Sequence, residues 1–420
     1  MTQLLKEVDL LGDNIPWLHD FRQQGKLVFS QTGVPNAKVE AWKYTKPNMF
    51  LEGDFVCSNN SSETNYQANI PFDCYKVCFV NGVFAPRFSN FPNDIEIMPL
   101  IEAIMLHPDI RKNIGNLADI NRHPFAALNA FYLNEGIYIH IPEGFKPDKP
   151  IVLIYHTETG GLLLMQNLRN LVILEKEAQA EIIEYFDYAG ELKSCYFNNI
   201  VNEIYLEEQA NLQHYKIQDE AFKAIHLALS CVNSKKDSVY KSFCLQKGAD
   251  LARNESAVDL IENGAYAEVN AVYMMNGWAT LDITTEIRHL ASETYSQQLV
   301  KGVVGDQAKG IFQGKIHIAQ NAIKTKGWQQ HRALLLSDDA EVDVKPELEI
   351  YADDVQCSHG SACGEIDAEQ LFYMKSRGMS EDVAKKMLIN AYIEEVIAKV
   401  DDEKISNWIR LLLKLPEENY

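Results

Sequence analysis

The chain has 420 residues, of which 46% are apolar and 23% are charged, so it can bury a large core and has the composition of an ordinary soluble globular protein. Its 39 basic and 59 acidic residues give a formal net charge of −20 at pH 7, and no local basic patch offsets this charge, so we expect no nucleic-acid partner. No run of about 18 or more apolar residues occurs, which argues against a transmembrane helix and a membrane partner.

The start of the chain and its cysteines indicate a cytoplasmic protein. Residues 1–7 lack the basic start and apolar run of a secretory signal. We therefore expect free thiols at the eight cysteines, which stand at positions 57, 74, 78, 195, 231, 244, 357 and 363. None forms a C-x-x-C pair, and the spacings match no self-contained zinc ribbon or ferredoxin-type site. Most should be structural, because a free cysteine usually packs as a small apolar side chain.

Residues 1–120 are expected to form a mixed, largely helical N-terminal region. Pro16 marks the start of a helix with an apolar stripe. A strand over residues 77–80 meets a hairpin turn at Asn81-Gly82, and residues 98–106 read as another short helix. No chemistry is evident in this region.

Residues 121–365 have the sequence pattern of a β-rich core. Short apolar runs, rich in β-branched and aromatic residues, alternate with Gly, Asn, Asp and Lys. The clearest expected strands cover residues 137–141, 151–155, 171–174, 182–186, 316–318 and 348–350.

A weak repeat runs through this core. An apolar residue, three mostly polar residues and an alanine recur, for example at Leu174–Ala178 and Leu206–Ala210. Ala178 and Ala210 are 32 positions apart, and Ala249 and Ala265 are 16 apart. Such spacings suggest equivalent corners of stacked coils, where a small residue avoids the coil above. The repeat favours a β-helix; a β-sandwich, which also has many short strands, is the alternative.

Residues 366–420 change to a helical pattern. Asp367 with Gln370 forms a capping box, and Gly378 follows a basic last turn. Ser380 caps a second helix, and a third runs from about Ile405 to Pro416. A small helical module has little core of its own, so its apolar surface should either cap the solenoid or dock another protein.

The familiar catalytic motifs are missing from the sequence. There is no G-x-x-x-x-G-K-[ST] phosphate loop, no G-x-G-x-x-G after a strand, no H-E-x-x-H and no G-x-S-x-G. The chain should therefore not bind ATP through a P-loop, and no catalytic residues are assigned.

One segment, residues 345–360, concentrates reactive side chains. On an extended strand Cys357 and His359 point to the same face, which pairs a soft sulfur with an imidazole, a combination suited to iron, copper or zinc. Two ligands cannot complete a tetrahedral site, so a metal would need ligands from elsewhere or from a second chain. The plainer alternative is a packed thiol beside a hydrogen-bonded imidazole, and a nucleophilic Cys–His pair is a further one.

Several segments together resemble a known family. Near the C-terminal end they are the run from Lys345 to Gly360, which contains C-S-H-G, then Asp367–Tyr373 and Ser376-Arg377-Gly378. Elsewhere they are Gly314-Lys315-Ile316, Ala322–Thr325 and Glu40-Ala41-Trp42-Lys43-Tyr44-Thr45. These motifs resemble the SufD family of iron–sulfur cluster assembly proteins over most of the chain, most densely from about residue 285 to 395.

The resemblance implies a fold and a set of partners. The fold is mainly β, with a right-handed parallel β-helix core over 121–365 between an N-terminal α/β region (1–120) and a C-terminal helical domain (366–420). The implied role is a non-enzymatic scaffold that pairs through the β-helix with a SufB-like paralogue and binds a SufC-like ABC ATPase through its C-terminal helices. Sulfur would arrive indirectly, from a cysteine desulfurase.

The resemblance also implies site residues. The family's functional histidine lies in C-S-H-G at the interface with SufB, so here it is His359, with a SufB cysteine as the proposed co-ligand of a nascent iron–sulfur cluster. Cys357 is a second candidate ligand, and whether flavin binds is open. On the C-terminal helices, the implied partner-binding residues are Leu371, Phe372, Tyr373, Arg377, Met387 and Tyr392.

Two departures from the family pattern affect this site. The family usually continues C-S-H-G with Ala, Thr and an aliphatic residue, whereas this chain has Ser361-Ala362-Cys363. Cys363 either fills the aliphatic position or adds a thiol near the site. Gln356 stands where Lys is common, which removes a positive charge.

Other interpretations predict different features. The SufB paralogue should carry an N-terminal cysteine cluster that Cys57, Cys74 and Cys78 do not match. A β-helix enzyme acting on carbohydrate should carry a secretory signal, which residues 1–7 lack. An acyltransferase solenoid should show a strict hexapeptide repeat, which the sequence lacks.

Overall fold

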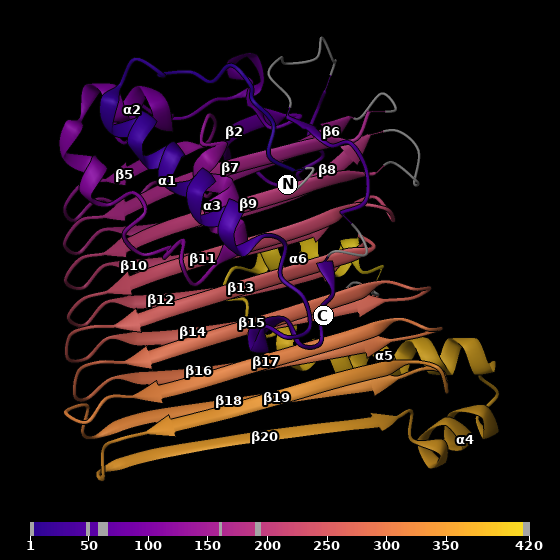
Figure 1. Ribbon diagram of the computed structural model, residues 1–420. Helices are drawn as coiled ribbons and strands as arrows, with labels where there is room; N and C mark the ends of the chain where they lie inside the picture. The colour runs from indigo at the N-terminus through magenta and orange to yellow at the C-terminus, as the bar shows by residue number, and fades with distance from the viewer. Residues whose placement is uncertain (1–3, 48–50, 58–65, 159–161, 190–194, 415–420) are drawn as a thin grey trace.

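The computed structural model describes residues 4–47, 51–57, 66–158, 162–189 and 195–414 (Figure 1). Within these residues two ten-stranded sheets face one another, and from β5 onward successive strands alternate between them. All pairings between these strands are parallel, so the chain winds as a flattened β-solenoid. The alternation confirms the predicted parallel β-helix and excludes the β-sandwich.

The strand bounds follow the predicted runs, and most strands are longer than the runs. In spatial order sheet A contains β19 (Glu341–Ile350), β17 (Lys309–Ile318), β15 (Thr280–His289), β13 (Leu251–Leu260), β11 (Ile225–Ser234), β9 (Tyr196–Leu206), β7 (Leu164–Leu174), β5 (Ile137–Ile141) and β4 (Glu96–Pro99), with β1 (Val56–Cys57) beside β7. Sheet B contains β20 (Val355–Glu365), β18 (Thr325–Leu335), β16 (Tyr295–Val304), β14 (Tyr266–Met275), β12 (Val239–Lys247), β10 (Asn211–Asp219), β8 (Gln179–Ala189), β6 (Ile151–Glu158), β2 (Tyr75–Val80) and β3 (Val83–Phe84).

The repeating alanines lie at corners between the sheets. Ala178 and Ala210, 32 positions apart, share one corner as predicted, but Ala249 and Ala265, 16 apart, lie at opposite corners, so the 16-residue spacing does not mark equivalent positions. Glu177 and Gln209, at the turns from sheet A to sheet B, both have φ of 59°, and each is followed by a fully buried alanine, Ala178 or Ala210. The backbone N–H of Glu177 donates to the Glu208 carbonyl of the next coil at 2.9 Å. The equivalent positions before β12 and β16 hold Ser238 and Thr294, which are also fully buried, so this corner accepts only short side chains.

The N-terminal region packs its helices on the first coils (Figure 1). Helices α1 and α3 contact one another, and α3 lies against β7 and β9 of sheet A. The predicted helix start at Pro16 and the hairpin at Asn81-Gly82 are confirmed. The helices are α1 (Pro16–Thr32), α2 (Leu100–Leu106) and α3 (Pro124–Phe131), with short 3-10 turns η1 (Glu40–Trp42), η3 (Pro86–Phe88) and η4 (Pro108–Lys112).

Of the C-terminal helices in the described residues, α5 (Glu381–Ile397) and α6 (Glu403–Leu412) lie against the outer face of sheet B, and α4 (Ala368–Ser376) contacts α5. The predicted caps are present: Asp367 accepts from the Glu369 and Gln370 backbone, and Ser380 from Val383. Trp408 of α6 is 2% exposed and packs edge-on against Tyr185 of β8. Pro416, the predicted end of the third helix, lies outside the described residues.

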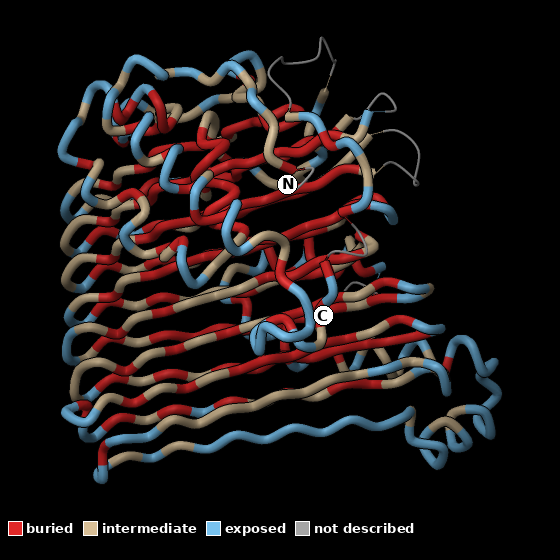
Figure 2. Tube along the Cα trace, in the orientation of Figure 1, coloured by how far each residue is buried: buried red, intermediate tan, exposed pale blue. Residues whose placement is uncertain are grey.

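The two ends of the solenoid differ. At the first coil the antiparallel strands β3 and β4 close both sheets. At the last coil β19 and β20 are edge strands, because α5 and α6 cover the flank rather than the end. Figure 2 shows β20 as an almost continuously exposed strand, with only Val355 and Cys357 half-buried. Among the described helices, none combines the length and hydropathy needed to cross a bilayer.

Candidate functional site

Cys357 and His359 lie on β20, the edge strand of the open end. Cys357 is half-buried and packs against Ile316 and Ile318 in the interior of the last coils. Since side chains alternate along a strand, His359, Ser361 and Cys363 share this inner face. The site is therefore at the rim of the solenoid interior, where the coil above would lie if the solenoid continued.

The thiol of Cys357 is protected rather than activated. Burial raises its pKa, and a contact with the Gly327 backbone N–H offsets only part of that rise. The side chain is therefore a thiol at neutral pH, and binding a metal would require it to lose a proton. No charged side chain contributes to this rise in the pKa of Cys357.

The imidazole of His359 is exposed, and no described side chain or backbone group forms a hydrogen bond or ion pair with it. A packed thiol beside a hydrogen-bonded imidazole thus does not describe this pair. Nor does a hydrogen bond join His359 to Cys357, as a nucleophilic Cys–His pair would require. The ring nitrogens of His359 are free to bind an external group.

The described part of the chain contains no cluster of three or more His, Cys, Asp or Glu side chains arranged to hold a metal ion. Cys363, the third potential ligand on the inner face, is exposed at the far end of β20. It lines a cleft of about 320 Å³ with Leu388 and Tyr392 of α5. In a strand, Cys363 would lie roughly 13 Å along from His359, too far for a shared ion. Among the described residues, therefore, Cys357, His359 and Cys363 do not form a complete metal site.

All eight cysteines lie in described residues and all are free thiols, as predicted. Cys74, Cys78 and Cys231 are buried, and burial raises the pKa of each. These three cysteines are buried as thiols and serve as packing residues.

The open end presents both unpaired backbone and apolar side chains. The outer edges of β19 and β20 have no neighbouring strand, so each offers a row of unpaired N–H and C=O groups. On β19 the inner face carries Val342, Val344 and Leu348, which are only half-buried. Such an edge is a template for adding strands from another chain.

The residues assigned to partner binding on the C-terminal helices fall into two groups. Phe372 is 73% exposed, Tyr373 58% and Met387 46%, an unusual apolar surface for a short helical module. Arg377 covers Tyr373, with its guanidinium 5.2 Å from the ring centre and donating to the phenol oxygen at 3.2 Å. Leu371 is half-buried.

Tyr392 differs from these residues, because it contacts the solenoid. Its ring lies 4.3 Å from Lys301 Nζ of β16, and Lys301 donates to the Tyr392 backbone carbonyl at 2.6 Å. Burial raises the pKa of the Tyr392 phenol. Tyr392 therefore holds α5 against sheet B.

The segment Glu40–Thr45, which sequence reasoning treated only as a family motif, crosses the outer face of sheet A; we call it the strap. Trp42 lies 4.2 Å from the Arg253 guanidinium, and the Thr45 hydroxyl hydrogen-bonds Asp282. A cleft of about 370 Å³ between the strap and the sheet is lined partly by Arg122, Lys315 and Lys345. In the sequence, the only indication that the strap contacts the sheet was that this short motif combines an aromatic residue, a cation and a hydroxyl.

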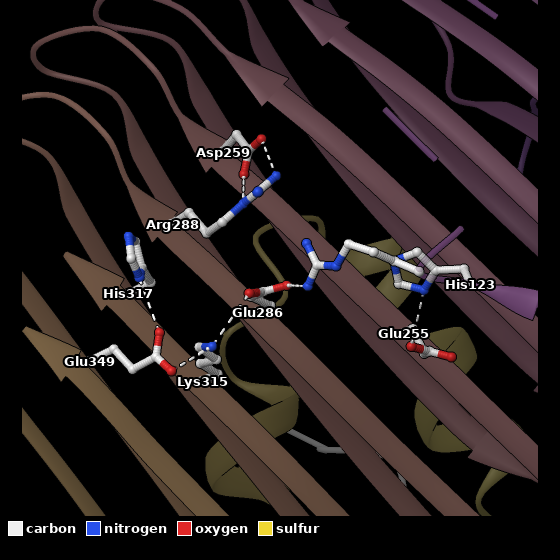
Figure 3. Close-up of polar contacts among 9 residues, drawn as sticks. His123, Glu255, Asp259, Glu286, Arg288, Lys315, His317 and Glu349 are labelled. Atoms are coloured by element: carbon white, nitrogen blue, oxygen red, sulfur yellow. Dashed lines mark hydrogen bonds and ion pairs between the residues drawn. The ribbon is translucent and has the colours of Figure 1, made fainter. Parts of the chain in front are cut away.

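The charged side chains around this cleft pair with one another. Figure 3 shows His317 and Lys315 both contacting Glu349, at 3.2 and 2.8 Å, while Lys315 also approaches Glu286. Arg288 and Asp259 form a separate pair. These ion pairs join successive coils across the outer face of sheet A.

Comparison with known proteins gives consistent matches along the chain. Residues 6–153 match the family description "SufBD protein N-terminal region", and residues 155–392 match "SUF system FeS cluster assembly, SufBD core domain". The iron–sulfur cluster assembly protein SufD of Escherichia coli is 30% identical over 393 residues, which is 92% of this chain and 90% of that protein.

Two further relatives show similar coverage. The iron–sulfur cluster assembly SufBD family protein slr0076 of Synechocystis is 29% identical over 95% of this chain and 91% of its own length. The chloroplastic protein ABCI7 of Arabidopsis thaliana is 30% identical over 79% of this chain and 68% of its own.

Proposed function

Because the chain belongs to the SufBD family of iron–sulfur cluster assembly proteins, we propose that it is a non-enzymatic scaffold subunit that completes its site with a SufB-like paralogue. The observation that carries this proposal is the open last coil. There an exposed histidine, with no hydrogen-bond partner among the described residues, lies on the inner face of an edge strand that is paired on one side only. The resemblance to SufD proteins over nearly the whole chain supports it.

Pairing at the open end follows from the physics of an edge strand. Strands from a second solenoid would satisfy the backbone groups of β19 and β20, and they would cover Val344 and Leu348. Removing this apolar surface from water supplies a driving force of about 25 cal/mol for each Å² buried. The seam would enclose His359 in a water-poor space between two chains.

At this seam His359 would ligate iron of the nascent cluster, which is the cargo of the complex. Neutral imidazole is a common iron ligand, and a cysteine of the paralogue would supply a thiolate beside His359. Cys357 is the weaker candidate, because its raised pKa disfavours the thiolate.

The C-terminal helices would bind a SufC-like ATPase. Phe372, Tyr373 and Met387 provide exposed apolar anchors, and Arg377 adds a cation beside them. Leu371 would pack beneath this surface, while Tyr392 would fix α5 to the solenoid. ATP hydrolysis and sulfur release by a desulfurase then belong to partner proteins.

Replacing His359 by Ala in the complex co-expressed with SufB-like and SufC-like proteins tests this function. Cluster formation, followed by anaerobic absorption spectroscopy, should be lost while size-exclusion chromatography still shows the intact complex. His317→Ala is the control, because His317 is a half-buried histidine on the outer face of β17, paired with Glu349 at 3.2 Å. Full cluster formation in the His359→Ala complex would rule out the ligand role.

A further inference from the structure

The two edge strands of the open end differ in how their sequences protect them from pairing. Five of the ten residues of β19 are charged, whereas β20 has no Lys, Arg, Asp or Glu before Glu365, its last residue. β19 also contains a proline, Pro346, and β20 contains none. Charged side chains and proline are means by which proteins keep a free strand edge from pairing. The sequence thus protects the edge of β19 and leaves that of β20 unprotected.

Pro346 faces the free edge of β19 rather than β17. The N–H of Glu341 donates to the Ala308 carbonyl at 3.1 Å, on the β17 side. The N–H of Tyr351, just past the strand, donates to the Ile318 carbonyl at 3.0 Å on the same side. Because backbone groups alternate between the two sides of a strand, odd-numbered residues face β17 and even-numbered residues face the free edge. Proline has no N–H, so this edge lacks its middle donor.

The free edge of β20 has no such gap. Tyr295 of β16 donates its N–H to the Ala265 carbonyl on the β14 side, at 3.1 Å. Its register partner Lys326 donates to the Thr294 carbonyl on the β16 side, also at 3.1 Å. Register partners thus face the same way along the sheet, so Gln356, the partner of Lys326, faces β18. The free-edge N–H groups of β20 are therefore those of Cys357, His359, Ser361 and Cys363.

Another backbone has room to approach β20. The strand is 11 residues long, about twice the usual length of a strand, and apart from Val355 and Cys357 its residues are exposed. A Cβ atom at Gly360 would meet no other atom of the described chain within 4 Å. A long, uncharged edge without proline is a site for strand addition.

We propose that β20 carries the continuous backbone ladder to the SufB-like paralogue and that Pro346 breaks the ladder on β19. A partner strand on β20 meets a donor at every second residue, whereas a strand on β19 leaves the carbonyl opposite Pro346 without a donor. The two edges are therefore not interchangeable, which holds the second chain to one placement on the open end. Pairing along β20 also fixes the backbone of His359 at the seam. This inference rests on the proposed function and names the strand that binds the paralogue.

Exchanging the residue types of the two edges tests the proposal. Ser361→Pro removes a donor from the free edge of β20 and leaves the bonds to β18 in place, so the isolated chain should melt within a few degrees of the wild type. Its affinity for the SufB-like paralogue should fall at least tenfold. Ser361→Ala is the matched control, because it keeps the N–H, and it should bind within twofold of the wild type. Equal binding by the two variants overturns the proposal.

The reciprocal change tests the role of the proline. Pro346→Ser supplies the missing donor of β19, so it should not weaken binding to the paralogue. The isolated chain should now self-associate at several-fold lower concentration in analytical ultracentrifugation, because its second edge is no longer interrupted. A Pro346→Ser chain that self-associates no more than the wild type shows that the proline does not protect β19.

Hydrogen exchange of the wild-type chain gives a measurement that needs no variant. When the paralogue binds, the free-edge amides within residues 355–365 should exchange at least tenfold more slowly. If these amides stay unprotected in an intact complex whose cluster formation needs His359, the inference fails and the ligand role stands. If they are protected but His359→Ala assembles cluster normally, the ligand role fails and the ladder stands.

Discussion

Glu40 and Lys345 are 305 residues apart in the chain, yet their side chains form an ion pair of 2.7 Å. The contact joins the strap near the N-terminus to β19 of the last coil. Gln313 of β17 adds a hydrogen bond to the Ala41 carbonyl at 3.2 Å. The N-terminal region, which packs on the first coils, is thus tied to the open end as well.

The strap should stabilise the protein mainly through Trp42, which is 4% exposed and stacks on Arg253. Trp42→Ala should lower the free energy of unfolding by about 3–5 kcal/mol, because it leaves a large cavity and removes the cation–π contact. Glu40→Gln should have little effect, since Glu40 is fully exposed. Thermal and urea unfolding compare the two variants, and equal stabilities would contradict this account.

The open end should lose its partner when a charge is placed on it. Ser361 is exposed on the inner face of β20, so Ser361→Lys should leave the isolated chain folded. At a seam the lysine would be buried without a partner, which should weaken co-purification with the SufB-like paralogue at least tenfold. Asp338→Lys introduces the same residue at an exposed corner before β19 and is the control. Equal binding by both variants would place the interface elsewhere.

The exposed helical residues should matter for ATPase binding and little for folding. Phe372→Asp changes a side chain that is 73% exposed, so the melting temperature should stay within a few degrees of the wild type. Binding to the SufC-like ATPase, measured by titration calorimetry, should fall at least tenfold. Leu411→Asp, at a 56% exposed site on α6, controls for a new charge on the helical module. A Phe372→Asp variant that binds normally would exclude this surface.

Two buried histidines should destabilise the protein as the pH falls. Burial lowers the pKa of His289 to about 3 and that of His331 to about 4, against 6.5 for an ordinary histidine. Below pH 6.5 these two histidines bind protons in the unfolded chain but stay neutral in the folded chain. The free energy of unfolding therefore falls as the pH decreases towards their folded pKa values. Each histidine contributes at most about 1.4 kcal/mol per pH unit in this window.

His289→Gln should therefore flatten the loss of stability between pH 6.5 and 5, measured by urea unfolding. His19→Gln, at an exposed position of α1, should not. The buried carboxylate Glu184 acts in a lower window: burial raises its pKa, but Lys216 and His214 outweigh this and lower it to about 2. The stabilisation that ionised Glu184 gives to the folded chain is lost only as the pH falls below about 4.5. If the free energy of unfolding changed equally with pH in His289→Gln and His19→Gln, the assignment to His289 would be contradicted.

Features set by local chemistry were predictable from the sequence. Asp367 and Ser380 cap their helices because a short acceptor beside the first turn binds the nearest free N–H groups. The hairpin at Asn81-Gly82 follows from two residues that tolerate positive φ. Short side chains recur at the corners because the stacked coils leave little room there, so the 32-residue spacing of Ala178 and Ala210 reflects one full coil.

Features set by contacts between distant residues were not predictable. Helix α3 has no amphipathic pattern, because every residue from Phe125 to Phe131 is buried between α1 and the sheet. Gln329 gives no local sign of lying beneath His359, since that relation depends on the register of β18 and β20. Met98 belongs to β4, so the helix expected over 98–106 begins at Leu100.

The closure of the first coil has a consequence for how large an assembly can become. A solenoid open at both ends could join head to tail without limit and grow into a fibre. Here β3 and β4 pair antiparallel at the first coil, so under the proposed pairing only the last coil would offer parallel strands to another solenoid. Growth by this route would then stop at a pair.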